Sequence, residues 1–268
     1  MPDCQHIPFE KLPVLDGMPP ILLEEMGAIT LMNRIDSKYL TDEQTLVGIL
    51  EDARADGYRA LLADGTKYCS YNSLYYDTPG MQMFLDHHNR RLVRQKVRTR
   101  VYVGSGRTYL EIKRKNNHGR TKKKRTEIAP AEFGDFRTNP QACDYLAAHS
   151  RFTADSIEPT LETGFRRITL VNPAETERLT IDTCLHFKNL RTGRTVSLQN
   201  AVVIELKQDG RTASQMKEIL LRHRVKPIRV SKYCIGVTLT DPAVKSNRFK
   251  PKVRRIEKQI NTKILPAL

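Results

Sequence analysis

The sequence predicts an α+β protein in which antiparallel strands close into a β-barrel and helices pack against the outside of that barrel. Segments rich in β-branched and aromatic residues recur along most of the 268 residues, and helical segments interrupt them. Most of the expected strands pair one apolar face with one charged face. A hydrophobic content of 39% and a chain of this length are enough for a sizeable core.

The first half of the chain is expected to contain a proline-rich leader with a short helix over residues 1–28, followed by the main domain from residue 29. Thr41 or Asp42 with Gln44 resembles a capping box, which predicts a helix start at this point. The turn "NNHG" separates the strand expected over 107–115 from the strand expected over 121–129. The expected elements are a strand ending near Leu40, helices over 41–54 and 79–89, and strands over 67–79, 91–103, 107–115 and 121–129.

The second half is expected to complete the main domain at residue 241. The predicted elements are a helix over about 131–148, strands over 159–171, 178–187, 194–198 and 201–208, and helices over 212–224 and 231–240. Residues 242–268 are basic and weakly patterned, and they are interpreted as a C-terminal tail.

Positive charge dominates the composition. The chain carries 45 Lys and Arg against 30 Asp and Glu, a net charge of +15, which indicates an anionic partner such as nucleic acid, a membrane surface or a phosphorylated molecule. Residues 90–125 hold fifteen of these cations and a single acid, Glu111, and therefore nearly the whole excess. This concentration predicts a binding site or a basic arm.

The five cysteines are scattered, with no CxxC pair, which argues against a disulfide framework or a zinc knuckle and favours a reducing compartment. No apolar run approaches the roughly 20 residues that span a bilayer, and the N-terminus lacks the apolar stretch of a signal peptide. We therefore expect a cytoplasmic protein.

The segment "RRLVRQKVRTRVYV", residues 90–103, shows the alternation most clearly. Arg94, Lys96, Arg98 and Arg100 share one strand face, and valines occupy the other. Neighbouring cations on that face lie roughly 7 Å apart, so each adjacent pair costs about 2 kcal/mol at an effective dielectric of 20. Such a row requires compensation by an anion.

The same alternation recurs in six further strands, whose charged faces mix a few acids with many cations. Two geometries fit: an open sheet with its charged side in solvent, or a closed barrel with its charged side inward. The mixed signs favour the barrel, because acids among cations suit a polyanion held together with a divalent metal. The residues sharing these faces are Arg34, Asp36 and Lys38; Glu111, Lys113 and Lys115; Lys123, Arg125 and Glu127; Arg167 with Phe165 and Thr169; Arg178, Thr180 and Asp182; and Glu205 with Lys207.

Six segments carry a family resemblance: "RIDSKYL", "SLYYDTPGMQMFLDHHNRR", "VRTRVY", "YLEIKRK", "VVIELK" and "RVSKYC". In this order and spacing they resemble the VTC (vacuolar transporter chaperone) domain, the polyphosphate polymerase branch of the CYTH-like triphosphate tunnel metalloenzymes, over about residues 30–240. The resemblance implies a closed tunnel and an enzyme that transfers the terminal phosphate of ATP to a growing polyphosphate chain with Mn²⁺ or Mg²⁺. The row of cations would then be compensated by a linear polyanion.

The resemblance also implies roles for individual residues. Phe165 stands where the family often has Tyr, and the run 122–125 leaves the register of Lys123 uncertain by one residue. The implied catalytic residues are Arg98, Arg100, Lys113, Arg167 and Lys232; the substrate-binding residues are Lys38, Lys96, Lys123, Arg125, Lys207, Arg229 and Ser231; and the metal ligands are Glu205 and Glu111.

Three functions remain open at this point: the polymerase, a triphosphate hydrolase, and a non-catalytic module that binds polyphosphate or nucleic acid. Hydrolytic relatives such as thiamine triphosphatase and class IV adenylyl cyclase carry E-x-E-x-K on the first strand, where this chain has Arg34, Asp36 and Lys38. This departure favours the polymerase. Tyr102 is the only aromatic residue in 90–108, so no sequence-specific nucleic-acid partner is expected. Export of the product would require a membrane-protein partner.

Two groups of residues near the predicted site are interpreted as structural. Tyr71, Tyr75 and Tyr76 are expected in the core, and His87 and His88 are expected to be surface or capping residues at the end of a helix.

Overall fold

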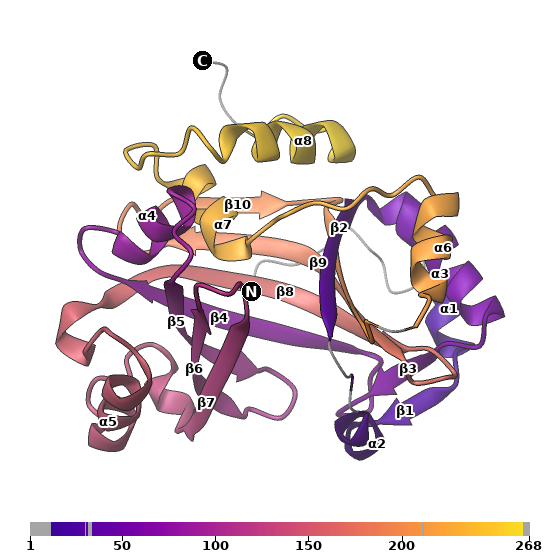
Figure 1. The fold of residues 1–268 in the computed structure, drawn as a ribbon, viewed down its shortest axis with the longest axis horizontal. Helices are drawn as coiled ribbons and strands as arrows, with labels where there is room; N and C mark the ends of the chain where they lie inside the picture. Colours follow the sequence, from indigo (N-terminus) through magenta and orange to yellow (C-terminus); the bar gives the residue numbers. More distant parts are fainter. Residues whose placement is uncertain (1–11, 30, 32–33, 211, 265–268) are drawn as a thin grey trace.

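One curled, mainly antiparallel sheet forms the centre of the protein (Figure 1). The computed structural model describes residues 12–29, 31, 34–210 and 212–264. The strands of the main path are ordered β2-β11-β9-β8-β4-β5-β6-β7, with β10 paired to β9 and β3 paired to β8 and, in parallel, to β1. The strands are β1 (Pro20–Leu22), β2 (Ile35–Thr41), β3 (Arg59–Leu62), β4 (Tyr68–Asp77), β5 (Arg94–Tyr102), β6 (Thr108–Lys115), β7 (Thr121–Ile128), β8 (Glu158–Val171), β9 (Glu177–Asn189), β10 (Thr195–Leu198) and β11 (Val202–Gln208).

Helices cover the apolar, convex side of this sheet, as the sequence predicts. One core cluster packs α1, α3 and α6 against apolar residues of β2, β8, β9 and β11, and a second packs α5 against β5 and β6. Alternation therefore places Ile181 and Ile204 under helices and their charged neighbours on the opposite face. The helices are α1 (Pro13–Asp16), α2 (Leu23–Ala28), α3 (Glu43–Ala55), α4 (Gln82–His88), α5 (Pro140–His149), α6 (Gln215–Arg222), α7 (Lys232–Thr240) and α8 (Lys250–Ile260), with short 3-10 turns at Pro130–Phe133 and Ala154–Ser156.

Helix α7 departs from the prediction that all helices lie outside, because it packs against the concave face. Its buried residues share a core cluster with Tyr71, Tyr75 and Phe165, which alternate onto that face. The backbone of Gly236 lies so close to the sheet that a Cβ at this position would lie 2.6 Å from both Leu161 and Phe187 side-chain atoms. Together with α4 and α8, α7 covers one end of the concave face (Figure 1).

The predicted closed barrel is wrong: among the described residues the sheet remains open between its edge strands β2 and β7. The segment before α7 occupies the free edge of β2, where Pro227 pairs with Tyr39 and the Ile228 amide donates to the Lys38 carbonyl at 2.8 Å. On the other edge, β7 presents a run of exposed cations, 122–125, and a lysine-rich edge disfavours strand pairing. The result is a curled half-barrel.

The segment interpreted as a tail contains the regular helix α8. Phe249, Val253, Ile256 and Ile260 are buried at helical spacing, while the intervening residues are mostly polar. Pro251 lies in the first turn, where its missing N–H is tolerated. Because most residues of this segment are basic or polar, its narrow apolar stripe was not recognised as a helical pattern in the sequence.

Several local expectations also changed. The helix expected over about 131–148 is a 3-10 turn followed by α5, because Asn139 accepts from the Ala142 amide and caps a new helix at Pro140. His88, expected at the surface, is 1% exposed and contacts Asn247 at 2.7 Å. Residues 1–11 of the predicted leader lie outside the described residues. In the described part of the chain, no helix has the length and apolarity needed to cross a bilayer.

Candidate functional site

Ten of the eleven predicted cationic site residues share the concave face. Strand pairing aligns them in rows: Lys96, Lys113 and Lys123 lie opposite one another on β5, β6 and β7. This register places Lys123 with Lys113 and assigns Lys122 to the other face of β7. The ten residues are Lys38, Lys96, Arg98, Arg100, Lys113, Lys123, Arg125, Arg167, Lys207 and Lys232.

Glu111 forms the first of three carboxylate-centred clusters on this face. Arg98 donates to Oε2 through Nε at 2.8 Å and Nη2 at 2.5 Å, and Lys123 donates to Oε1 at 3.0 Å. Burial alone would raise the pKa of Glu111, but Arg98, Arg100 and Lys123 outweigh it and hold the pKa well below its usual range. The carboxylate is therefore ionised and fixes both cations in place.

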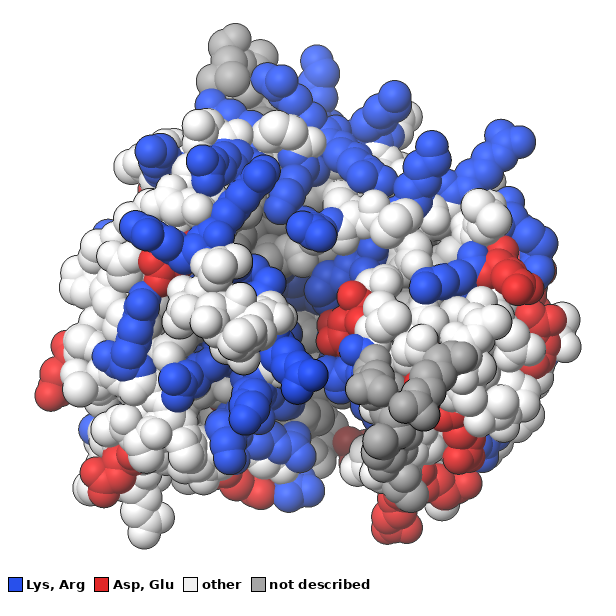
Figure 2. Space-filling view, in the orientation of Figure 1, with Lys and Arg blue, Asp and Glu red and all other residues white. Residues whose placement is uncertain are grey.

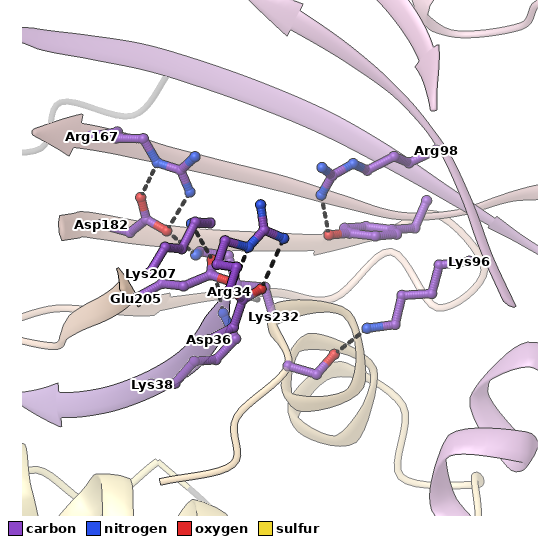
Figure 3. Close-up of polar contacts among 12 residues, drawn as sticks. Arg34, Asp36, Lys38, Lys96, Arg98, Arg167, Asp182, Glu205, Lys207 and Lys232 are labelled. Atoms are coloured by element: carbon purple, nitrogen blue, oxygen red, sulfur yellow. Dashed lines mark hydrogen bonds and ion pairs between the residues drawn. The ribbon is translucent and has the colours of Figure 1, made fainter. Parts of the chain in front are cut away.

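Asp182 is the centre of the second cluster, and sequence reasoning did not assign it a site role. Arg167 donates to both of its oxygens, at 2.6 and 2.8 Å, and Lys232 of α7 contacts Oδ2 (Figure 3). Burial raises the pKa of Asp182, but Arg167 and Lys232 lower it by more, to well below its ordinary value. The alternation in "RLTIDT" placed Asp182 on the charged face, and this was the available signal.

Glu205 is the most accessible of the three carboxylates. Lys38 and Lys207 lie 2.9 and 3.6 Å from its Oε2, and its side chain is 19% exposed, against 2% for Glu111 and 3% for Asp182. The three carboxylates thus hold six of the ten cations, two each. Ten positive and three negative charges leave an excess of seven on this set.

Aromatic rings form a floor beneath part of the site. Tyr71 and Phe165 stack nearly parallel with centroids 5.4 Å apart. Arg100 and Arg167 lie over both rings at 5.1–5.6 Å, and Lys232 lies 4.5 Å from the Phe165 centroid. A phenyl ring offers the same π face as a tyrosine, so Phe165 retains the cation contact without a hydroxyl.

Tyr75, interpreted as a core residue, also belongs to the site. Its hydroxyl accepts from Arg98 Nη1 at 2.8 Å, and its ring stacks on Tyr233. Burial pushes the pKa of Tyr75 upward, but Arg98, Lys96 and further cations outweigh it and lower the pKa to about 8. The sequence carried no signal for this role beyond the position of Tyr75 on a strand.

Of the remaining predicted site residues, Ser231 and Arg100 contact residues of the concave face, and Arg229 has no described contact with them. Ser231 caps α7 and accepts from Lys96 Nζ at 2.8 Å. Arg100 donates to Ser73 at 2.9 Å, and burial lowers its pKa to about 10. Arg229 is exposed, and no described contact joins it to the three clusters.

His87, expected at the surface, is half-buried. Burial lowers its pKa, and the nearby cations Lys96, Arg94, Lys113 and Lys115 lower it further. The imidazole therefore remains neutral beside the basic rows.

The carboxylates do not form a metal site by themselves. Within the described residues, no three potential His, Cys, Asp or Glu ligands gather. Both oxygens of Glu111 already accept from cations, which disfavours its predicted role as a second metal ligand. Glu205 fits only the mode in which one carboxylate joins substrate phosphate oxygens around a hard divalent cation.

The described residues thus form a curled sheet whose concave face collects cations around three carboxylates. The VTC domain family matches residues 33–240, and the chain belongs to this family. The predicted family membership is therefore confirmed.

Comparison with solved structures finds several similar chains, two of which are described here. A protein from Bacillus halodurans described as a "putative adenylate cyclase" shares 14% identity and a TM-score of 0.49, covering 75% of this chain and 96% of its own. A protein from Hippeastrum, similarly described and with a dominant triphosphatase activity, shares 16% identity and a TM-score of 0.49, covering 76% and 95%. No curated protein matches the chain. At this level of similarity neither protein's activity is transferred to this chain.

Proposed function

We propose that this protein is a polyphosphate polymerase, which transfers the terminal phosphate of ATP to a growing polyphosphate chain held along the concave face. The observation that carries the proposal is the excess of seven positive charges on ten fixed cations. A linear chain with about one charge per phosphate can neutralise such a face along its whole length, whereas one small anion cannot.

The arrangement suits phosphoryl transfer, because catalysis of this reaction depends mainly on positioning the phosphate groups and stabilising their charge. Arg98 and Arg167 are oriented by Glu111 and Asp182, so their guanidinium groups lose little freedom when phosphate binds. Lys113 has no hydrogen bond or ion pair among the described residues, and it is available to a phosphate. Burial and the neighbouring cations lower the pKa of Lys113. A bound phosphate would neutralise those cations and so raise the pKa again.

A divalent cation, Mn²⁺ or Mg²⁺, would enter with the nucleotide and take Glu205 as its protein ligand. The ion would supply charge neutralisation at the phosphate oxygens. Lys38 and Lys207, which hold Glu205 in the described structure, would then be released toward the substrate.

Incubation of the purified protein with labelled ATP and Mn²⁺ tests the proposal. We expect a ladder of polyphosphate on a gel. Release of orthophosphate alone would instead identify a triphosphate hydrolase, and the absence of turnover with retained polyphosphate binding would identify a binding module. A cytoplasmic location and a membrane partner for export remain predictions that this experiment does not address.

Three substitutions on the concave face, with a control on the convex face, locate the activity. Lys113→Gln should reduce turnover at least ~10-fold, because a phosphate contact is lost without breaking an internal ion pair. Glu205→Gln should abolish the metal-dependent reaction with little loss of stability, and Arg98→Ala should also remove activity. Lys124→Gln, on the convex side of the same sheet, should retain full turnover. Equal loss in Lys124→Gln would contradict the assignment of the concave face.

A further inference from the structure

Helix α8 carries a basic surface that the proposed reaction does not use. Its apolar stripe is buried against the core, which turns its cations outward: Arg254, Arg255 and Lys258 are exposed, and Lys252 is half-buried at one border of the stripe. Figure 2 shows Lys and Arg side chains gathered over α8 and continuing toward the hollow in the centre of this view. The helix therefore presents a fixed row of positive charge.

This row meets further cations at the end of the concave face. Arg94 precedes Lys96 by two residues on the same face of β5, and Lys96 contacts Ser231 at the start of α7. Arg229 lies two residues before Ser231. Besides burial, the charges of Arg90, Arg229 and Arg94 lower the pKa of Lys252, which agrees with their proximity.

Six of these residues are defined here as the external basic surface. No ion pair involves any of them in the part of the chain that the structure describes. On the concave face, by contrast, carboxylates hold six cations. The six residues are Arg90, Arg94, Arg229, Lys252, Arg255 and Lys258.

The chemistry of this surface favours a flexible polyanion over a membrane or RNA. An interfacial helix inserts an apolar face into lipid, but Val253, Ile256 and Ile260 of α8 are buried in the protein core. Single-stranded nucleic acid is gripped largely by stacking on aromatic side chains, and no exposed Phe or Tyr is found among the large hydrophobic residues that the structure describes. A linear inorganic chain needs only a row of cations.

We propose that the external basic surface binds the part of a linear polyphosphate chain that extends beyond the concave face. This inference rests on the proposed function, which places the growing polyphosphate chain along the concave face. The surface then continues the row of cations from Lys96 and Arg94 onto α8, so that long chains are held at two connected places and short ones at only one.

Binding of two ligands to the full chain tests the inference: tripolyphosphate, which the concave face can hold alone, and a polyphosphate long enough to extend past it. The test variant is Lys252→Gln/Arg255→Gln/Lys258→Gln. The matched control is Arg114→Gln/Lys122→Gln/Lys124→Gln, which removes the same charge from the convex side of β6 and β7. Thermal unfolding and circular dichroism establish that both variants are folded.

We expect the α8 variant to bind the long chain about ten-fold more weakly, with tripolyphosphate affinity unchanged. The slope of log K against log salt concentration for the long chain should become less steep by about 2, because each of the three lost phosphate contacts contributes about 0.7 to that slope. The inference would be overturned if the α8 variant kept its affinity for the long chain, or if the control variant lost as much affinity. It would also be overturned if the α8 variant lost binding only to phosphatidylserine vesicles or only to RNA. Failure of the unmodified protein to bind tripolyphosphate would instead refute the proposed function.

Discussion

Individual carboxylates determine the geometry of this site more than the cations do. Glu111, Asp182 and Glu205 each hold two cations that would otherwise repel one another. Because Asp182 is 3% exposed, removing its charge leaves Arg167 and Lys232 buried without compensation. Breaking a buried pair in this way is far more costly than losing a surface pair.

Asp182→Asn is therefore expected to destabilise the folded protein by about 3 kcal/mol, measured by urea unfolding. Added tripolyphosphate should recover part of the loss, since the anion replaces the missing charge. Glu127→Gln is the control, because the Glu127–Arg107 pair is about half exposed and its loss should change stability far less than the loss of the Asp182 charge. Equal destabilisation of the two variants would contradict this role of Asp182.

The pKa of the Tyr75 hydroxyl should provide a direct measure of the positive electrostatic potential in the site. An acidic group whose folded pKa is lowered from 10.0 to about 8 stabilises the folded state fully above pH 10, and this contribution disappears as the pH falls through 8. We expect the tyrosinate absorbance of the wild type minus that of Tyr75→Phe to titrate near pH 8, and tripolyphosphate to raise this midpoint by neutralising nearby cations.

Tyr71→Phe serves as the control for this titration. Burial raises the pKa of Tyr71 to about 12, so its removal should leave the absorbance below pH 10 unchanged. A wild-type curve without a component near pH 8 would show that the cations do not act on Tyr75 as described.

At the scale of elements, the position of α7 connects the core to the site. Its residue Lys232 reaches Asp182, its cap Ser231 contacts Lys96, and Gly236 allows its close approach to the sheet. Local patterns predicted this helix and most strands, because alternation and caps act over a few residues. They did not predict that α7 packs on the concave side, which depends on contacts between residues far apart in the chain.

Gly236→Ala tests the close packing of α7. Alanine gains about 1 kcal/mol in helix propensity, but overpacking against Leu161 and Phe187 costs about 1–3 kcal/mol. We therefore expect a net loss of thermal stability, together with weaker phosphate binding as Lys232 is displaced. Gly27→Ala in α2, where a Cβ would meet nothing within 4 Å, should be neutral or stabilising. A stabilised Gly236→Ala protein would contradict the packing described here.

For the whole molecule, the concentration of charge on one face should couple anion binding to folding. Tripolyphosphate at 100 times its dissociation constant should stabilise the folded state by about 2.7 kcal/mol, and sodium chloride should reduce this gain by screening. Orthophosphate at equal charge should stabilise less, because it cannot span neighbouring clusters. Equal melting shifts with both anions would argue against an extended site.

The alternation of charged and apolar residues, read from the sequence by itself, determined which side chains share a face, where the positive charge concentrates and which family the chain resembles. These properties follow from a period of two along each strand and need no knowledge of neighbours. Only the tertiary structure decided that the sheet stays open, that Asp182 and Tyr75 join the site, and that carboxylates hold cations in pairs. Each of these depends on which distant strands and helices become adjacent, a choice made by packing and edge pairing across the whole fold.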